Sequence, residues 1–162
     1  MRIRFLNVLA AAAVSATLVA AALVVTGGPA VAADPVEQVK AREALMKKMG
    51  GGMKVIGQFV KGEGGTQEEV QKAAAAIAEV SANDVAAVFP QGTAQGVGDS
   101  HAKPELWAQW SKTQQLWSDV RPAAAKLVDA AKAGDKAQVA QAMQATGKTC
   151  ANCHEEFRIK KQ

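Results

Sequence analysis

The sequence places its only two cysteines beside a histidine in the pentapeptide CANCH, from Cys150 to His154. Four kinds of chemistry use such a cluster: a thiol redox pair, part of a zinc site, a structural disulfide, or covalent attachment of haem. On a helix, residues three and four apart share a face, so Cys150, Cys153 and His154 are expected to point the same way. Two thiols can then bond one edge of a porphyrin while the imidazole reaches its iron, and Cys-x-x-Cys-His is the attachment signature of c-type haem.

The other three interpretations fit the rest of the sequence less well. A thioredoxin-like Cys-x-x-Cys needs a helix N-terminus after a strand, where the helix dipole lowers a thiol pKa, whereas this motif lies near a helix C-terminus. A closed zinc site needs four ligands, and only His101, alone in a long loop, remains to contribute. Two helical residues three apart rarely meet disulfide geometry. The pattern therefore favours haem.

An N-terminal leader predicts the compartment in which these cysteines function. Arg2 and Arg4 precede an uncharged apolar run, a Gly-Gly-Pro break and small residues up to Ala32. This pattern predicts a secretory signal peptide over residues 1–32, cleaved from a domain over residues 33–162; the alternative is a permanent membrane anchor. Of the 19 basic residues two lie in the leader, so the mature chain keeps 17 against 15 acidic residues. That surplus is too small to indicate nucleic-acid binding.

Apolar residues of the mature chain recur at helical spacing, and no alternating strand pattern is visible. The first predicted helix carries an apolar seam over residues 39–60, interrupted at residues 50–52 by three glycines. This interruption predicts a kink, or a place where another group approaches the backbone closely. The second helix begins at Thr66, with Glu69 as the partner in a capping box, and ends by Pro90.

The longest loop, residues 91–103, separates this half from two more predicted helices. Pro104 suits the first turn of the third helix, and Pro122 predicts a kink or break within it. The fourth helix begins after Asp135, with Gln138 as its box partner, and carries the Cys-x-x-Cys-His motif. The predicted fold class is therefore all-α: an antiparallel four-helix bundle with one covalently attached haem.

Longer segments around these residues resemble one family of haem proteins. The strings ATGKTCANCHEEFRIKK at the C-terminus, QVKAREALMKKMG near the start of the mature chain, VFPQGT before the long loop and KPELW after it resemble the class II c-type cytochromes. That family comprises cytochrome c′ and its low-spin, methionine-ligated relatives. The resemblance covers essentially the whole mature domain and is most specific in the terminal motif.

The resemblance implies one covalent haem c, held by two thioethers from Cys150 and Cys153, with His154 as the proximal iron ligand. It also implies export to the periplasm, and homodimers are common in the family. Glu43 and Thr93 match further haem-lining positions of the family.

Arg42 occupies a seam position of the first helix, where an apolar residue is expected. A buried guanidinium must be paired, and haem propionates are a natural bidentate partner. The family places a propionate-side arginine at this point of its first helix, so we predict that role for Arg42. The alternative is an arginine whose head group reaches solvent at the end of the bundle.

Met46 lies one helical turn after Arg42 on the same seam, so we expect it to project toward the distal side of the haem. A thioether is a soft ligand for haem iron, and a Met/His pair favours a raised potential and electron transfer. The string REALMKKMGGGMK resembles the methionine-ligated members, although some five-coordinate members carry a methionine here that only crowds the iron. Bundle methionines are also common core filler. The predicted metal ligands are His154 and Met46.

Residues outside the motif receive structural predictions. Trp110 and Trp117 are expected to pack in the core, and His101 is expected to be a solvated loop residue. Gly147 precedes Cys150 by about one helical turn, where it either permits close packing against the porphyrin or is simply a tolerated helix glycine. Arg158, one turn beyond His154, matches a basic residue that flanks the proximal histidine in the family.

A buried haem with no acid–base constellation or nucleophile–base pair predicts an electron carrier and no enzyme activity. The predicted function is transfer of single electrons between periplasmic or membrane-bound redox proteins. The alternative is a five-coordinate haem protein that binds nitric oxide or carbon monoxide, and a third interpretation is a helical thiol-redox protein. No nucleic-acid motif is visible in the sequence.

Overall fold

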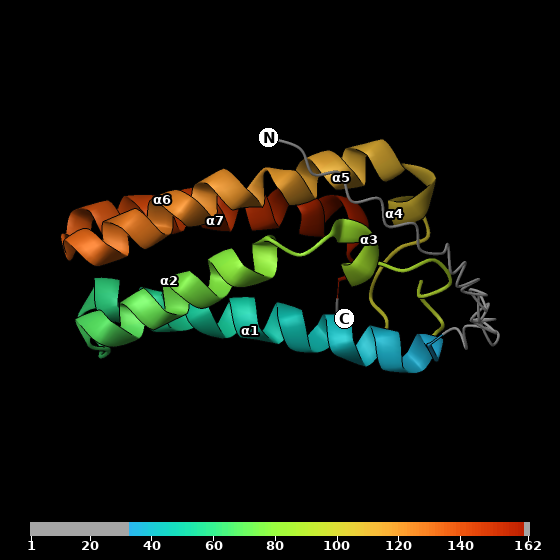
Figure 1. Cartoon of the computed structure of the whole chain (residues 1–162), viewed down its shortest axis with the longest axis horizontal. Helices are drawn as coiled ribbons and strands as arrows, with labels where there is room; N and C mark the ends of the chain where they lie inside the picture. Colours follow the sequence, from blue (N-terminus) through green and yellow to red (C-terminus); the bar gives the residue numbers. More distant parts are fainter. Residues whose placement is uncertain (1–32, 161–162) are drawn as a thin grey trace, which may run out of the picture. The chain divides into compact units, whose positions relative to one another are not determined.

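The computed structural model describes residues 33–160, so the predicted signal peptide lies outside the described residues. Four long helices dominate this part of the chain (Figure 1): α1 (Pro35–Lys61), α2 (Gln67–Ser81), α6 (Val120–Ala133) and α7 (Lys136–Phe157). Short turns join α1 to α2 and α6 to α7, so each pair is antiparallel, and the helices contact one another in the cyclic order α1, α2, α6, α7. The predicted all-α four-helix bundle is confirmed.

The bundle core forms along the predicted apolar seams. In each long helix the buried residues recur at spacings of three and four, which places them on one face. The fully buried side chains include Ile56 of α1, Val70 and Ile77 of α2, Leu127 of α6 and Val139 of α7. None of the described helices is long and apolar enough to cross a membrane.

The three consecutive glycines do not interrupt α1, which runs through them as one helix of 27 residues. A Cβ atom built on Gly52 would lie 3.1 Å from the carbonyl oxygen of Ala73 and 3.2 Å from the side chain of Ile77, both on α2. Gly50 and Gly51 have open space at the same place. The helix has no break at the glycines, and the alternative of a close backbone approach is confirmed at Gly52, where α2 packs against bare backbone.

The predicted helix starts agree with the structure. At α2 the Thr66 hydroxyl accepts from the Glu69 N–H at 3.2 Å, and the Thr66 N–H donates to the Glu69 carboxylate at 2.6 Å, which completes a capping box. At α7 the Asp135 carboxylate accepts from the Gln138 N–H at 2.8 Å, but the described contacts contain no return bond from the Gln138 side chain.

The third bundle helix is divided into three segments: α4 (Glu105–Ala108), α5 (Trp110–Ser118) and α6. The break between α5 and α6 falls at Asp119, so Pro122 lies in the first turn of α6. Because proline has no N–H and its ring collides with the carbonyl four residues earlier, a helix through Ser118 cannot continue unbroken past Pro122. The predicted break is confirmed, one turn before the proline. The earlier break at Gln109 was not predicted.

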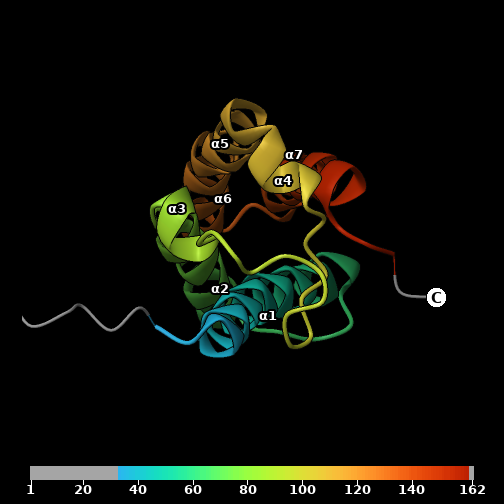
Figure 2. The same ribbon diagram turned by 90° about the vertical axis from the view of Figure 1, so that its right-hand side faces the viewer.

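A short helix, α3 (Val85–Val88), and the loop over residues 91–103 close one end of the bundle. Figure 2 shows this loop between α1 and α4. An isolated antiparallel bridge joins Ala102 to Arg158 just beyond α7. The Lys103 N–H donates to the Phe157 carbonyl, and the Ile159 N–H donates to the His101 carbonyl, each at 2.9 Å. The loop is thereby fastened beside the C-terminus of α7.

The tryptophan side chains pack at the same end of the bundle. Trp117 is buried, and its indole N–H donates to the Asn83 carbonyl at 3.0 Å, while its ring and that of Phe89 form a T-shaped pair at a centroid distance of 5.9 Å. Trp107 donates to the Phe89 carbonyl at 3.0 Å, and Trp110 packs against the core. The predicted packing role of Trp110 and Trp117 is confirmed.

Candidate haem-binding site

A cavity of about 520 Å³ lies between α1, α5, α7 and the loop over residues 91–103. Its volume lies within the range of small-molecule and cofactor sites. Helix α7 contributes Cys150, Cys153 and His154, so the three motif side chains open into one space, as their spacing predicts. Helix α1 contributes Arg42, Glu43 and Met46.

The two thiols are free and half-buried. Burial raises the pKa of Cys150, and burial together with the neighbouring Cys150 raises the pKa of Cys153 to about 11. Both side chains are therefore neutral thiols at physiological pH, and neither is the activated thiolate of a redox pair. Within residues 33–160, no three His, Cys, Asp or Glu side chains gather in an arrangement that could hold a metal ion.

The electrostatics of the site favour a neutral imidazole on His154. His154 is exposed, yet partial burial of its imidazole lowers its pKa, and the positive charge of Arg158, one turn further along the chain, lowers it further. Neutral imidazole is the form that binds a metal. Arg158 also lines the cavity, so the basic residue that the resemblance predicted beside the histidine is present there.

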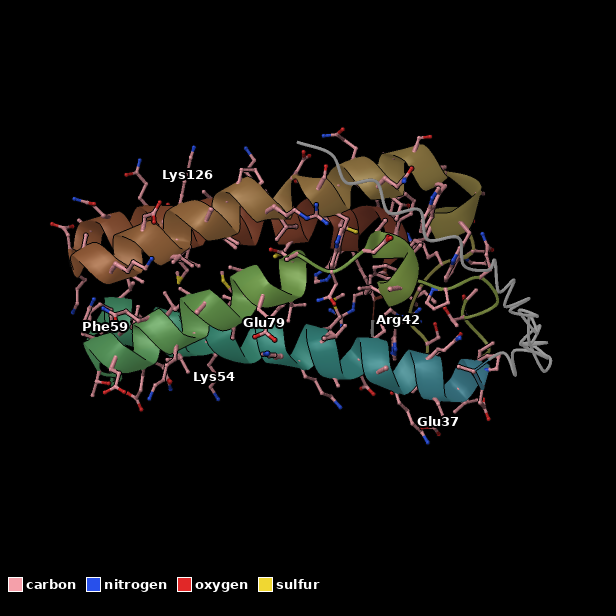
Figure 3. All side chains as sticks on the ribbon, viewed as in Figure 1. Glu37, Arg42, Lys54, Phe59, Glu79 and Lys126 are labelled. Carbon is pink, nitrogen blue, oxygen red and sulfur yellow. The ribbon has the colours of Figure 1, made fainter. Side chains whose placement is uncertain are left out.

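Arg42 is buried, with 6 % of its surface exposed, and its side chain points inward from α1 (Figure 3). Its Nη1 donates to Thr93 Oγ1 at 2.7 Å, and its Nη2 donates to the Thr93 carbonyl and to Ser100 Oγ, both at 2.9 Å. The guanidinium also lies 5.2 Å from the centre of the Phe89 ring. These contacts rule out the alternative of an arginine whose head group reaches solvent.

The Arg42 charge has no carboxylate partner among the described residues, because no Asp or Glu oxygen there lies within ion-pair distance. Burial lowers the pKa of Arg42, yet a guanidinium stays protonated in proteins. A buried cation that lines the cavity without an anion fits a ligand that carries carboxylates, as haem does. Three of the five N–H donors are already bonded to Thr93 and Ser100.

The remaining predicted residues divide between the cavity wall and the layer behind it. Met46 and Glu43 are half-buried on the wall, and Glu43 also pairs with Lys47 at 3.0 Å. Thr93 is fully buried but does not line the cavity; its contact is with Arg42. Gly147 lines the cavity, and a Cβ atom built there would lie 3.6 Å from Met53 Cε.

Two loop residues at the site were not anticipated in their observed places. Ser100 is buried against Arg42, and no sequence signal distinguishes it from other loop serines. His101 was expected to be solvated, but it is half-buried and lines the cavity, because its backbone is bonded to Ile159. Its Nδ1 lies 2.8 Å from the Asp99 carbonyl oxygen. A carbonyl can only accept, so Nδ1 carries the proton.

The fold and the site define a helical-bundle haem protein of the c type. The family model described as Cytochrome C′ matches residues 37–158. A cytochrome c′ from Pararhodospirillum photometricum is 39 % identical over 129 residues, which cover 78 % of this chain and 99 % of that protein. A cytochrome c-556 from Agrobacterium tumefaciens (strain B2A) is 34 % identical over 128 residues, covering 76 % and 98 %.

Among solved structures, a nitric oxide complex of a cytochrome c prime variant from Alcaligenes xylosoxidans is similar, with a TM-score of 0.69 and 28 % identity. The match covers 80 % of this chain and 99 % of that one. This chain belongs to the cytochrome c′ family. It is accordingly a haem protein with one covalent haem c, and its two cysteines lie together on the cavity wall.

Proposed function

We propose that the protein carries single electrons, through a haem held by thioethers from Cys150 and Cys153 and ligated by His154 on α7 and Met46 on α1. When bound, haem supplies an iron centre that exchanges one electron. The observation that carries the proposal is that Met46 and His154 both line the cavity. Helix α1 therefore offers a thioether sulfur and helix α7 an imidazole nitrogen to the same space. With His154 and Met46 as its ligands, the haem would have a raised reduction potential, which would suit electron transfer.

The other side chains then bind and shield the cofactor. Arg42 binds a haem propionate through the N–H donors that the loop leaves free. Each of these donors can make a single hydrogen bond to the propionate while all three contacts with the loop persist. Glu43 lies at the edge of the cavity beside Lys47, and Thr93 supports Arg42 from behind. Buried apolar side chains such as Leu106 and Phe157 line the rest of the cavity and exclude water, which limits reorganisation when the charge of the iron changes.

Ferric electronic spectra of the purified holoprotein test the ligation. The wild type is expected to be low-spin, and Met46→Ala is expected to become high-spin because the sixth ligand is lost. Met53→Ala is the matched control, since Met53 also lines the cavity, about two turns further along α1. A wild type that is already high-spin, with a spectrum unchanged by Met46→Ala, would defeat the ligation.

A second candidate function is binding of a diatomic gas by a five-coordinate haem. The similarity to a protein solved as a nitric oxide complex favours it. In that case Met46 lies close to the iron without bonding it, and the wild-type protein binds nitric oxide or carbon monoxide rapidly, because no ligand has to leave first. Under the electron-carrier proposal, gas binding is slow in the wild type and becomes fast in Met46→Ala, because the thioether no longer has to leave. Stopped-flow mixing of the ferrous protein with carbon monoxide separates the two.

We further propose export to the periplasm, with cleavage of the signal peptide after Ala32 and a mature domain over residues 33–162. The Cys-x-x-Cys-His motif and the leader support this proposal together. The redox partners are then periplasmic or membrane-bound proteins, and a homodimer is the expected assembly. Mass spectrometry of the periplasmic holoprotein should give a chain that begins at Ala33 and carries one haem, and sedimentation analysis should give twice its mass.

A further inference from the structure

The hydrogen-bond directions around Arg42 are fixed by the number of protons that each partner has. The Thr93 hydroxyl donates its one proton to the Pro90 carbonyl at 2.8 Å, so toward Arg42 it can only accept. The Ser100 hydroxyl donates its one proton to the Thr93 carbonyl at 2.8 Å, so it too can only accept from Arg42. The hydrogen bonds among Arg42, Thr93, Ser100 and the Pro90 carbonyl are therefore compatible in one arrangement, and no buried side-chain N or O atom in the described residues lacks a partner.

The five N–H donors of the Arg42 guanidinium therefore fall into two groups, those bonded to the loop and those left free. Its Nη2 gives one N–H to the Thr93 carbonyl and the other to Ser100 Oγ, which uses both donors of that nitrogen. Nε and the second N–H of Nη1 remain. Ser100 and Arg42 both line the cavity, so the acceptor that holds this N–H belongs to the wall of the space that we propose for the haem.

We infer that Ser100 is a positioning residue that withholds one N–H of Arg42 from a haem propionate and so sets the reduction potential below the value that Arg42 alone would give. The inference rests on the proposed contact between Arg42 and a propionate. Its physical basis is that a buried N–H donor seeks an acceptor, because leaving it unbonded is costly. Without the Ser100 hydroxyl, the freed N–H turns to the carboxylate, neutralises more of its charge and stabilises the reduced iron.

The sign of the effect distinguishes positioning from simple support. If Ser100 only held the cluster together, its loss would loosen Arg42, and the potential would fall as it does when the charge is removed. Positioning predicts the opposite: Ser100→Ala raises the potential, whereas Arg42→Gln lowers it because a positive charge near the iron is lost. In the double variant the potential should equal that of Arg42→Gln, because Ser100 acts only through Arg42.

The experiment is a spectroelectrochemical titration of purified holoprotein for the wild type, Ser100→Ala, Arg42→Gln and the double variant. Ser81→Ala is the matched control, because Ser81 is also buried and its hydroxyl donates to the Ala78 carbonyl at 2.8 Å, away from the cavity. It should leave the potential unchanged. Ser100→Thr, which keeps a hydroxyl, should stay close to the wild type, and Ser100→Gly replaces Ser100→Ala if the latter does not fold.

Each other outcome overturns a defined part of the reasoning. An unchanged or lowered potential in Ser100→Ala, while Arg42→Gln lowers it, refutes the positioning role and leaves the Arg42–propionate contact intact. An upward shift that persists in the double variant shows that Ser100 acts without Arg42, which also refutes it. An unchanged potential in Arg42→Gln refutes the contact with the propionate on which the inference rests.

Discussion

Replacing single glycines of α1 by alanine separates helix propensity from packing. Gly51→Ala adds a methyl group with nothing within 4 Å of it, so only the propensity gain of about 1 kcal/mol remains. Gly52→Ala makes the same gain but places its Cβ 3.1 Å from the Ala73 carbonyl oxygen, which is backbone and cannot turn aside. Overpacking of this kind typically costs about 1–3 kcal/mol.

Because the propensity gain is common to both variants, it cancels in their comparison. Gly52→Ala should be less stable than Gly51→Ala by about 1–3 kcal/mol, and Gly51→Ala more stable than the wild type by up to about 1 kcal/mol. For a domain of this size, each kcal/mol shifts the melting temperature by about 3–5 °C. Urea unfolding of the holoproteins, followed by circular dichroism, measures the difference. If Gly52→Ala proved as stable as Gly51→Ala, the close contact between α1 and α2 would be refuted.

Further variants test the cofactor site and the N-terminal cap of α2. Replacing both Cys150 and Cys153 by serine should abolish haem staining on denaturing gels, whereas either single variant keeps one thioether; staining of the double variant would contradict the attachment. Gly147→Leu should lower the haem content of the purified protein because its side chain extends into the cavity, whereas Gly147→Ala makes only an ordinary 3.6 Å contact with Met53; full haem content in the leucine variant would contradict this placement. Thr66→Ala should cost about 1 kcal/mol at neutral pH, and Thr66→Ser much less. Hydrogen bonds from Thr66 lower the pKa of Glu69 below 4.5, so stabilisation by this carboxylate is present above that pH and lost as pH falls through the lowered pKa. The bond to this carboxylate comes from the backbone N–H of residue 66, which alanine keeps, so Glu69→Gln is the variant that tests it. The difference between wild type and Glu69→Gln in urea unfolding should narrow in acid, and an unchanged difference at pH 3 would contradict the pairing.

The parts of the fold that could be predicted depend on residues close together in the sequence. The Thr66 and Asp135 caps, the break near Pro122 and the shared face of Cys150, Cys153 and His154 all follow from spacings of three or four residues. The Gln109 break has no glycine or proline to signal it. Gly52 could be noticed in the sequence, but the sequence did not distinguish a kink from a close contact at this residue.

The parts that could not be predicted depend on contacts between distant segments. Arg42 was identified because a charge in an apolar seam needs a partner, but its contacts lie 51 and 58 residues further along the chain, at Thr93 and Ser100. Likewise, His101 lies on the cavity wall only because the loop is bonded beside the end of α7. A local pattern contains no information on which loop serine or histidine such a pairing will bury.

The residues proposed to attach the haem lie on α7, whereas the residue proposed to decide between electron transfer and gas binding lies on α1. In both proposed functions the motif on α7 holds the cofactor, so the distinction between electron carrier and gas-binding protein depends on what α1 presents to the cavity. Two contacts limit rotation of α1 about its axis: Arg42 is bonded to the loop over residues 91–103, and Gly52 lies against α2. Met46 lies between these two points, within three turns of either. Its direction into the cavity therefore depends on residues that are not themselves proposed ligands, and under the proposed function a change at Gly52 is expected to disturb ligation by Met46 although Met46 is retained.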